Sequence, residues 1–221
     1  MRKANRAVLA CWVIVLVSVC CAAQSGKVES LGPLSDNAVP DAVRQSLDAK
    51  GYRLTLDDPK STCGLWLRKS VPASTAKESD NIVYPEFAES VMLGVIHFPD
   101  AAADFRGHKI PAGFYTMRYE LMPDDGNHLG AAPNRDFVLL IPAASDTDPS
   151  AAYKFQELSA LSAATAGTKH PAPLSLVPAD KPGAGTVARD EQDHWIFSSN
   201  LKLASGNDLP FALIVKGTAQ Q

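Results

Sequence analysis

The fold of this chain is decided by residues 105–142, which read FRGHKIPAGFYTMRYELMPDDGNHLGAAPNRDFVLLIP. Residues 114–122 alternate between two faces, with Tyr115, Met117, Tyr119 and Leu121 on one and Thr116, Arg118 and Glu120 on the other. This period of two predicts a β-strand, and the apolar run at residues 136–141 predicts its neighbour. The glycines and proline of residues 107–113 predict a turn before them, since glycine accepts positive φ and proline cannot donate to a ladder.

Further strands are predicted on both sides of this region. Period-two alternation around a polar turn predicts one hairpin at residues 52–67 and another at residues 194–216. Residues 90–98 are apolar on both faces, which is typical of a central strand covered from two sides. A short strand is also predicted at residues 174–177, inside the proline-rich connector 168–185.

Two helices complete the predicted fold. A proline in the first turn and a following glycine predict a short helix over residues 40–50, and an aspartate cap, a proline and a glycine stop predict another over residues 149–166. Residues 24–51 are predicted as an irregular N-terminal arm followed by the first helix. The pattern favours a mainly β fold, a single antiparallel β-sandwich at residues 52–217 with two peripheral α-helices.

The start of the chain predicts export. Three basic side chains come first, residues 7–20 form an apolar run, and small residues follow. This order predicts a signal peptide at residues 1–23, cleaved near Ala23, and a periplasmic or extracellular location. The alternatives are an uncleaved membrane anchor and lipid attachment through Cys20 or Cys21.

Cleavage would leave an acidic chain with one cysteine. The signal carries three of the 21 basic residues and none of the 24 acids, so 18 basic residues face 24 acids and the formal net charge becomes −6. Nucleic acid and anionic membranes require clustered cations, so neither is predicted as a partner, and no membrane span is predicted after cleavage. Cys63 remains alone, which excludes an internal disulfide and predicts a small buried side chain.

The loop between the two central strand signals is the best candidate for a site. It has twelve residues, more than the two to five or so of an ordinary hairpin. Asp125 and His128 lie in it, and Asp136 follows it. Together with His97 or His108, these residues offer the oxygen and nitrogen ligands that a divalent metal prefers. No spacing matches a known metal motif, and the alternative is a turn in which aspartates bind local backbone amides and His128 orients the loop.

Candidate ligand-binding residues are Asp125, His128, Arg135, Asp136 and Trp66. Arg135 stands at the exit of the long loop, where it is predicted to anchor the loop with Asp136. Trp66 is the aromatic side chain expected to be most exposed, because its neighbours in the hairpin strand occupy the opposite face. An exposed ring would suit a sugar or peptide ligand, and core filling is the alternative.

A resemblance to known proteins rests on several ordered pieces. GYRLTL, GLWLRK, LGVIHFP, FRGHKIPAGFYTMRYEL, DGNHLG and RDFVLLIPAA resemble segments of a family of uncharacterised exported bacterial proteins, across residues 52–211. The stretch IPAGFYT at residues 110–116 is similar, more loosely, to the strand opening of transthyretin-like and carboxypeptidase-regulatory β-sandwiches. The second resemblance implies a fold and no particular activity.

The sequence therefore favours a binding or interaction module over an enzyme. No catalytic residue is predicted, because neither a nucleophile nor an oxyanion donor can be assigned, and no GxSxG motif or phosphate-binding loop is present. The expected partner is a protein, peptide or carbohydrate ligand, and no cofactor is predicted. Two alternatives stay open: a metal-dependent enzyme that uses residues 124–136, and a structural protein associated with the cell envelope.

Overall fold

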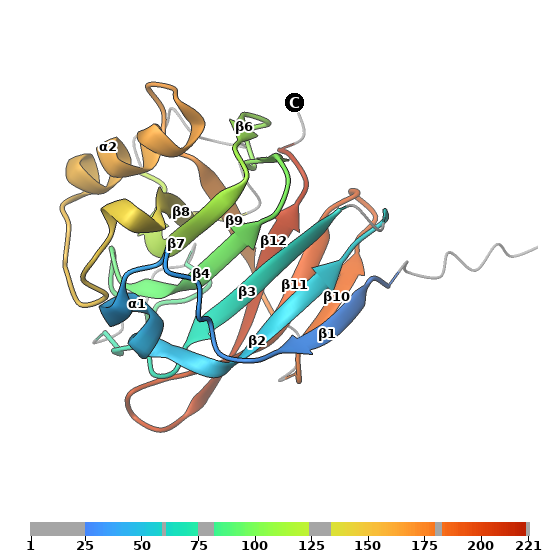
Figure 1. Ribbon diagram of the computed structural model, residues 1–221, viewed down its shortest axis with the longest axis horizontal. Coiled ribbons are helices and arrows are strands. Elements are labelled where there is room, and N and C mark those ends of the chain that lie inside the picture. Colours follow the sequence, from blue (N-terminus) through green and yellow to red (C-terminus); the bar gives the residue numbers. More distant parts are fainter. Residues whose placement is uncertain (1–24, 59–60, 75–81, 124–133, 180–182, 220–221) are drawn as a thin grey trace, which may run out of the picture.

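One antiparallel sheet organises the chain (Figure 1). The computed structural model describes residues 25–58, 61–74, 82–123, 134–179 and 183–219. Within these residues ten strands follow one another across the sheet: β1 (Lys27–Leu31), β2 (Leu47–Thr55), β3 (Thr62–Arg68), β4 (Met92–Phe98), β7 (Gly113–Leu121), β8 (Asp136–Pro142), β9 (Pro173–Val177), β12 (Asp208–Lys216), β11 (Trp195–Lys202) and β10 (Thr186–Arg189). A small hairpin, β5 (Ala102–Ala103) with β6 (Lys109–Ile110), lies beside it. The predicted mainly β, antiparallel fold is confirmed.

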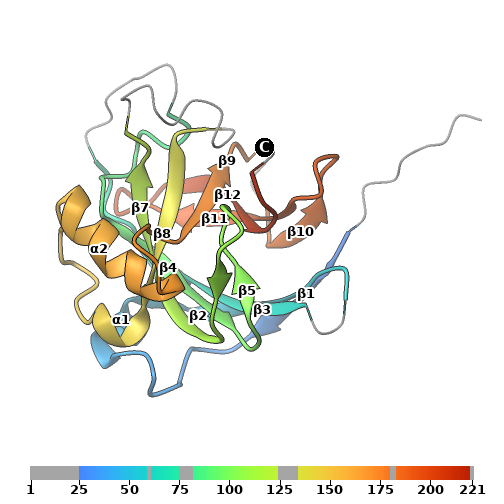
Figure 2. The ribbon, with the colours of Figure 1, turned by 90° about the horizontal axis from the view of Figure 1, so that it is seen from above.

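The two ends of the sheet come together, so the fold is nearly a barrel. Ser25, just before β1, forms a bridge with Ala188 of β10, and the Gly26 amide donates to the Val187 carbonyl at 3.0 Å. Figure 2 shows the resulting wall, with β7 and β8 on one side and β10 on the other. The predicted sandwich of two separate sheets is not confirmed, because the ten strands are hydrogen-bonded in one continuous order.

Strand β9 joins the two halves of the wall. Its first residues pair with β8, where Leu174 lies opposite Val138. Its last residues pair with β12, where Leu176 lies opposite Leu213. One short strand thus connects the two halves of the sheet, and the sheet curls round a common interior.

Apolar side chains fill the interior of the wall. Tyr52 of β2 meets Phe197 of β11 with ring centroids 5.1 Å apart, although the two strands are not neighbours in the sheet. Cys63 is buried and unpaired in the same cluster, as the sequence predicted. Because each fully buried Leu or Phe contributes about 1.5–3 kcal/mol, this interior can hold the fold without a disulfide.

Two helices cover the outside of the wall. Helix α1 (Asp41–Ser46) places Val43 in a cluster with Trp66 of β3 and Val95 of β4. Helix α2 (Phe155–Ala166) packs against β8, and its Ser162 and Thr165 hydroxyls both donate to the Leu140 carbonyl at 2.8 Å. Several strands are therefore covered on both faces, which explains their continuous apolar sequences.

The secondary structure differs from the prediction mainly at the edges of the wall. The predicted irregular arm contains β1, and the end of the predicted connector is followed by β10, which was not predicted at all. Both strands are short and partly exposed, so their sequences lack a strong apolar alternation. The predicted helix at residues 40–50 ends at Ser46, because Leu47 already pairs with Arg68 of β3.

The second helix begins later than predicted. It starts at Phe155 rather than at residue 149, and the capping interaction comes from Glu157, which accepts the Lys154 amide at 3.0 Å. In residues 149–154, the Ala151 carbonyl accepts a hydrogen bond from a buried arginine described below, and the Tyr153 amide donates to the Ser90 hydroxyl. Local helix signals were overridden there by a tertiary contact that the sequence pattern does not reveal.

Candidate functional site

The predicted metal site is only partly within the described residues. Asp125 and His128 lie outside them. Asp136 is fully buried, and its carboxylate accepts the Val83 and Tyr84 amides, both at 2.9 Å, and the Tyr119 hydroxyl at 2.8 Å. These three donors fix residues 83–84 to the end of the β7–β8 pair. Asp136 therefore acts as an anchor within the fold.

The two predicted histidine ligands have other contacts. His97 stacks on Phe114 with ring centroids 4.0 Å apart, and partial burial lowers its pKa. His108 lies in the turn between β5 and β6, where its Nδ1 is 3.1 Å from the Asp104 carboxylate. Within the part of the chain that the structure describes, no three acidic, histidine or cysteine side chains gather as metal ligands.

The prediction that Trp66 is exposed is wrong. Its side chain is 7% exposed, and its Nε1 donates to the Gly32 carbonyl at 2.9 Å. The outer face of β3, which the alternation suggested was open, is covered by residues 32–34 and helix α1. Trp66 consequently offers no ring to a ligand. Arg135 donates from Nε to the Met122 carbonyl at 2.9 Å and so links the two strands at the base of the long loop.

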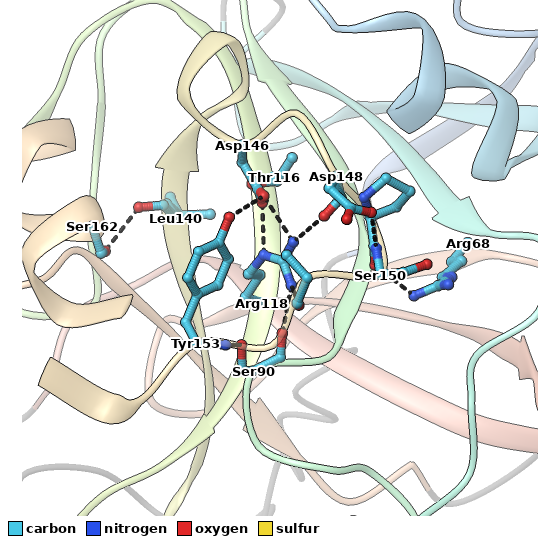
Figure 3. Close-up of polar contacts among 12 residues, drawn as sticks. Arg68, Ser90, Thr116, Arg118, Leu140, Asp146, Asp148, Ser150, Tyr153 and Ser162 are labelled. Carbon is cyan, nitrogen blue, oxygen red and sulfur yellow. Dashed lines mark hydrogen bonds and ion pairs between the residues drawn. The ribbon is translucent and has the colours of Figure 1, made fainter. Parts of the chain in front are cut away.

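The outer face of β7 carries a buried ionic network that the sequence analysis missed. Arg118 is fully buried and makes a two-pronged contact with Asp146, from Nε at 2.7 Å and from Nη2 at 2.7 Å (Figure 3). Its remaining N–H groups donate to the carbonyls of Ser90, Ala151 and Asp148 at 2.7–2.8 Å. All five donors of the guanidinium are used.

The remaining contacts of Asp146 complete this network. The Thr116 hydroxyl donates to Asp146 at 2.6 Å, and the Tyr153 hydroxyl donates at 3.3 Å. The Tyr153 ring also lies over the Arg118 guanidinium, 4.7 Å from its central carbon. We call Arg118, Asp146, Thr116, Ser90 and Tyr153 the outer network. It leaves no guanidinium donor free for a ligand, and it explains why residues 149–154 do not join α2.

A neighbouring carboxyl on the same face is buried without a cation. Glu120 is 2% exposed, and its Oε1 accepts the Leu121 amide at 3.0 Å. Burial raises the pKa of Glu120 to about 7, and the nearby Glu89 carboxylate acts in the same direction. The group can therefore change its charge near neutral pH.

An opening with ligand-like dimensions lies at one end of the barrel. It encloses about 780 Å³ and is formed where β2, β4, β10 and β12 end, since alternate strands of an antiparallel sheet finish at the same end. Its buried lining residues are Cys63, Phe98 and Val215. Burial raises the pKa of the Cys63 thiol to about 12. We call this opening the barrel-end pocket.

The charged residues that line the barrel-end pocket are mostly acidic. It contains Asp57, Asp58, Asp100 and Asp193, with Lys216 as the basic residue among its described lining. Lys216 donates from Nζ to both oxygens of Asp57, at 2.8 and 3.0 Å, and holds the pKa of that carboxyl below its ordinary value. Sequence analysis treated these aspartates as turn residues. The sequence did contain a signal for this site. Aspartates occur in the turns after β2, β4 and β10, and these strands end at the same end of the sheet.

Two similar turns stand beside this pocket. In the first, Asp104 accepts the His108 amide at 2.8 Å and its other oxygen is 3.1 Å from His108 Nδ1. In the second, Asp190 accepts the His194 amide at 2.8 Å and its other oxygen is 3.1 Å from His194 Nδ1. The turns touch through Phe105, whose ring lies 5.5 Å from that of His194. The repeated geometry identifies the Asp–His pair as a way of closing a tight turn.

Comparisons with other proteins add no assignment to this geometry. In the described part of the chain, no helix has the length and apolar character that crossing a membrane would need. Protein-family models, curated proteins and solved structures yield no match to the chain.

Proposed function

We propose that this chain is an exported binding protein that holds a small ligand in the barrel-end pocket. The observation that carries the proposal is a cavity of about 780 Å³ that combines a buried apolar lining with exposed carboxylates. Pockets for small molecules usually measure about 300–1,000 Å³ and pair apolar walls with a few polar groups. The mouth of a β-barrel is a common place for such a pocket.

The charges of the pocket favour a ligand with a positively charged group. Four aspartates and one lysine among its described lining residues give a net negative charge, and a concave surface concentrates the field of like charges. The buried lining, which includes Phe98, suits an apolar body. An alkyl or aromatic amine has both properties, so we assign the pocket to this ligand class.

Export supports a binding role over an intracellular one. The predicted signal at residues 1–23 would deliver the chain to the periplasm or the exterior, where its acidic surface carries a formal net charge of −6 after cleavage. One free cysteine that is buried suits an oxidising compartment, because it forms no disulfide with a partner while folded.

Calorimetric titration of the mature chain with three probes of equal length tests the proposal. Octylammonium should bind, octanol should bind more weakly, and octanoate should bind at least about ten-fold more weakly than octylammonium, because the carboxylates repel it. Raising the salt concentration should reduce this preference. Equal affinity for octylammonium and octanoate, or no binding of either, would remove the proposal.

A matched pair of variants locates the site. Asp100 makes no hydrogen bond or ion pair with the other described residues, so Asp100→Asn should weaken octylammonium binding about two- to five-fold without altering the fold. Asp41→Asn removes another exposed carboxylate, on helix α1 and outside the pocket, and should leave the affinity unchanged. The same loss in both variants would mean that the ligand senses overall charge only.

A further inference from the structure

The environment of His194 is unusual because both ring nitrogens face an acceptor. Nδ1 lies 3.1 Å from a carboxylate oxygen of Asp190, and Nε2 lies 3.2 Å from the backbone carbonyl oxygen of Thr218. The side chain is 4% exposed, so water has little access to either nitrogen. A neutral imidazole carries one proton and can donate to only one of these oxygens. Only the imidazolium satisfies both.

The contact with Thr218 holds the chain just after β12. The ring of His194 lies so close to Gly217 that a Cβ there would come within 2.5 Å of it, and Gly217 also has a positive φ of 148°. One residue further on, the Ala219 amide donates to the Phe105 carbonyl at 2.9 Å. Residues 217–219 are therefore fastened at two points, one on each of the similar turns.

The fastened segment is also a wall of the barrel-end pocket. Gly217 and Thr218 line the pocket, as do Gln192 and Asp193 of the turn that carries His194. Any movement of residues 217–219 away from His194 would change the shape of the pocket on this side. The contact between His194 and Thr218 thus links a titratable ring to the shape of the candidate ligand site.

Other charged groups near His194 are paired among themselves. Asp190 is the carboxylate that contacts its ring, and Arg189 and Asp193 form an ion pair at 2.8 Å on the same hairpin. On the facing turn Asp104 is paired with His108, and at the end of β12 Lys216 is paired with Asp57. His194 is therefore the titratable group whose proton directly bridges its turn to residues 217–219.

We propose that His194 is a proton-dependent latch on the wall of the barrel-end pocket, closed by the imidazolium and released by the neutral ring. As a statement about ligand binding, this inference rests on the proposed function of the pocket. Loss of one ring proton as the pH rises leaves one of the two oxygens without a donor, so the latch would open with rising pH. The pocket wall would be held at the acidic end and loosened at the alkaline end.

Nuclear magnetic resonance on the wild-type mature chain tests the latch without any ligand. In a series of spectra from pH 5.5 to 8, both ring nitrogens of His194 should carry protons while the latch is closed, and one proton should be lost as it opens. Over the same range, the protection of the Ala219 amide against exchange, corrected for the intrinsic pH dependence, should fall about three- to ten-fold. A ring that is neutral at pH 5.5, a ring that stays charged at pH 8, or protection that ignores the ring titration would each overturn the proposal.

Two variants distinguish His194 from His108, the histidine of the similar turn. His194→Gln should abolish the pH dependence of Ala219 protection, because glutamine does not titrate. His108→Gln should keep that dependence, because the His108 ring makes its described contact with Asp104 and none with residues 217–219. If His108→Gln removes the dependence as well, the wrong histidine has been assigned.

Titration of octylammonium at pH 5.5 and 8 then connects the latch with the pocket. Binding should weaken about three- to ten-fold at pH 8 in the wild type and should not change in His194→Gln. If the protection of the Ala219 amide depends on pH but octylammonium does not bind, the latch is upheld and the proposed function is removed. If octylammonium binds but the protection of Ala219 does not change with pH, the proposed function is upheld and the latch is removed.

Discussion

Two polar regions of this protein use the same kinds of side chain in different surroundings. In the outer network, Arg118 and Asp146 are both fully buried, and every guanidinium donor has an acceptor. At the barrel-end pocket, Asp57, Asp100 and Lys216 are exposed around an open cavity. Buried charges with all their partners fix backbone segments in place, whereas an exposed carboxylate beside the cavity, such as Asp100, remains available to a ligand.

The difference separates stability from binding in a way that variants can test. Removing one member of a buried ion pair leaves the other charge without a partner in a place that water does not reach, which costs several kcal/mol. Removing an exposed carboxylate changes stability by a fraction of 1 kcal/mol or so. Variants of the outer network should therefore change unfolding, and variants of the pocket should change affinity.

The largest effect is expected from Arg118→Met. The substitution strands the buried Asp146 carboxylate and three carbonyl groups, so the free energy of unfolding should fall by about 3–5 kcal/mol in urea titrations at pH 7. Arg53→Met, at an exposed arginine of β2, is the control and should change stability by less than about 0.5 kcal/mol. A similar small change in both variants would show that the outer network contributes little to folding.

A smaller loss is expected from Asp136→Asn. The amide keeps the shape of the side chain but replaces one acceptor oxygen and removes the charge, so at least one of its three donors loses its partner. Thermal and urea unfolding should report a loss of about 2–3 kcal/mol. Tyr119→Phe removes only the hydroxyl donor and should cost about 1 kcal/mol. A larger loss in Tyr119→Phe than in Asp136→Asn would contradict the assignment of Asp136 as the anchor.

Glu120→Gln should stabilise the protein, and only at neutral to alkaline pH. The folded pKa of Glu120, about 7, lies above its ordinary value of 4.5, so the protonated carboxyl favours the fold below pH 4.5 and this contribution is lost as the pH rises through 7. Glutamine stays neutral at every pH. The free energy of unfolding of the variant should therefore exceed that of the wild type at pH 8 by on the order of 1 kcal/mol. The gain should shrink towards pH 5 in a series of urea titrations. Equal gains at both pH values would contradict this account.

The smallest change in stability is expected from Asp100→Asn, the pocket variant. Its unfolding free energy should match that of the wild type within about 0.5 kcal/mol, although it binds octylammonium more weakly. Such a result would complete the contrast with Arg118→Met, which should retain the affinity of its folded fraction. Destabilisation of Asp100→Asn by several kcal/mol would show that the pocket rim also supports the fold.

Sequence reasoning succeeded where a pattern extends over several residues. The alternation in residues 52–67 and the apolar run in residues 90–98 correctly predicted β2, β3 and β4, because periodicity reports which face of a strand is buried. It failed for β1 and β10, although each pairs with the next strand along the chain, β2 and β11. Both are short and partly exposed, so too few of their side chains are buried to give a periodic pattern.

The candidate site was harder to predict than the fold. Trp66 appeared exposed by alternation alone, because nothing in its own strand reveals that residues 32–34 cover it. Arg118 gave no hint of burial, since its five acceptors come from segments distant in sequence. The aspartates of the pocket were visible as turn residues, and only the closing of the sheet brings them round one cavity.

The junction of β1 with β10 also has a consequence for the order of folding. Ser25 and Ala188 lie at nearly opposite ends of the described chain, so the seam that they form can close only after almost all the strands have been synthesised. Contacts of such long sequence separation carry a high cost of loop closure and form slowly. Until residues 187–188 are in place, the outer edge of β1 lacks its partner, so the open barrel presents an unpaired strand edge.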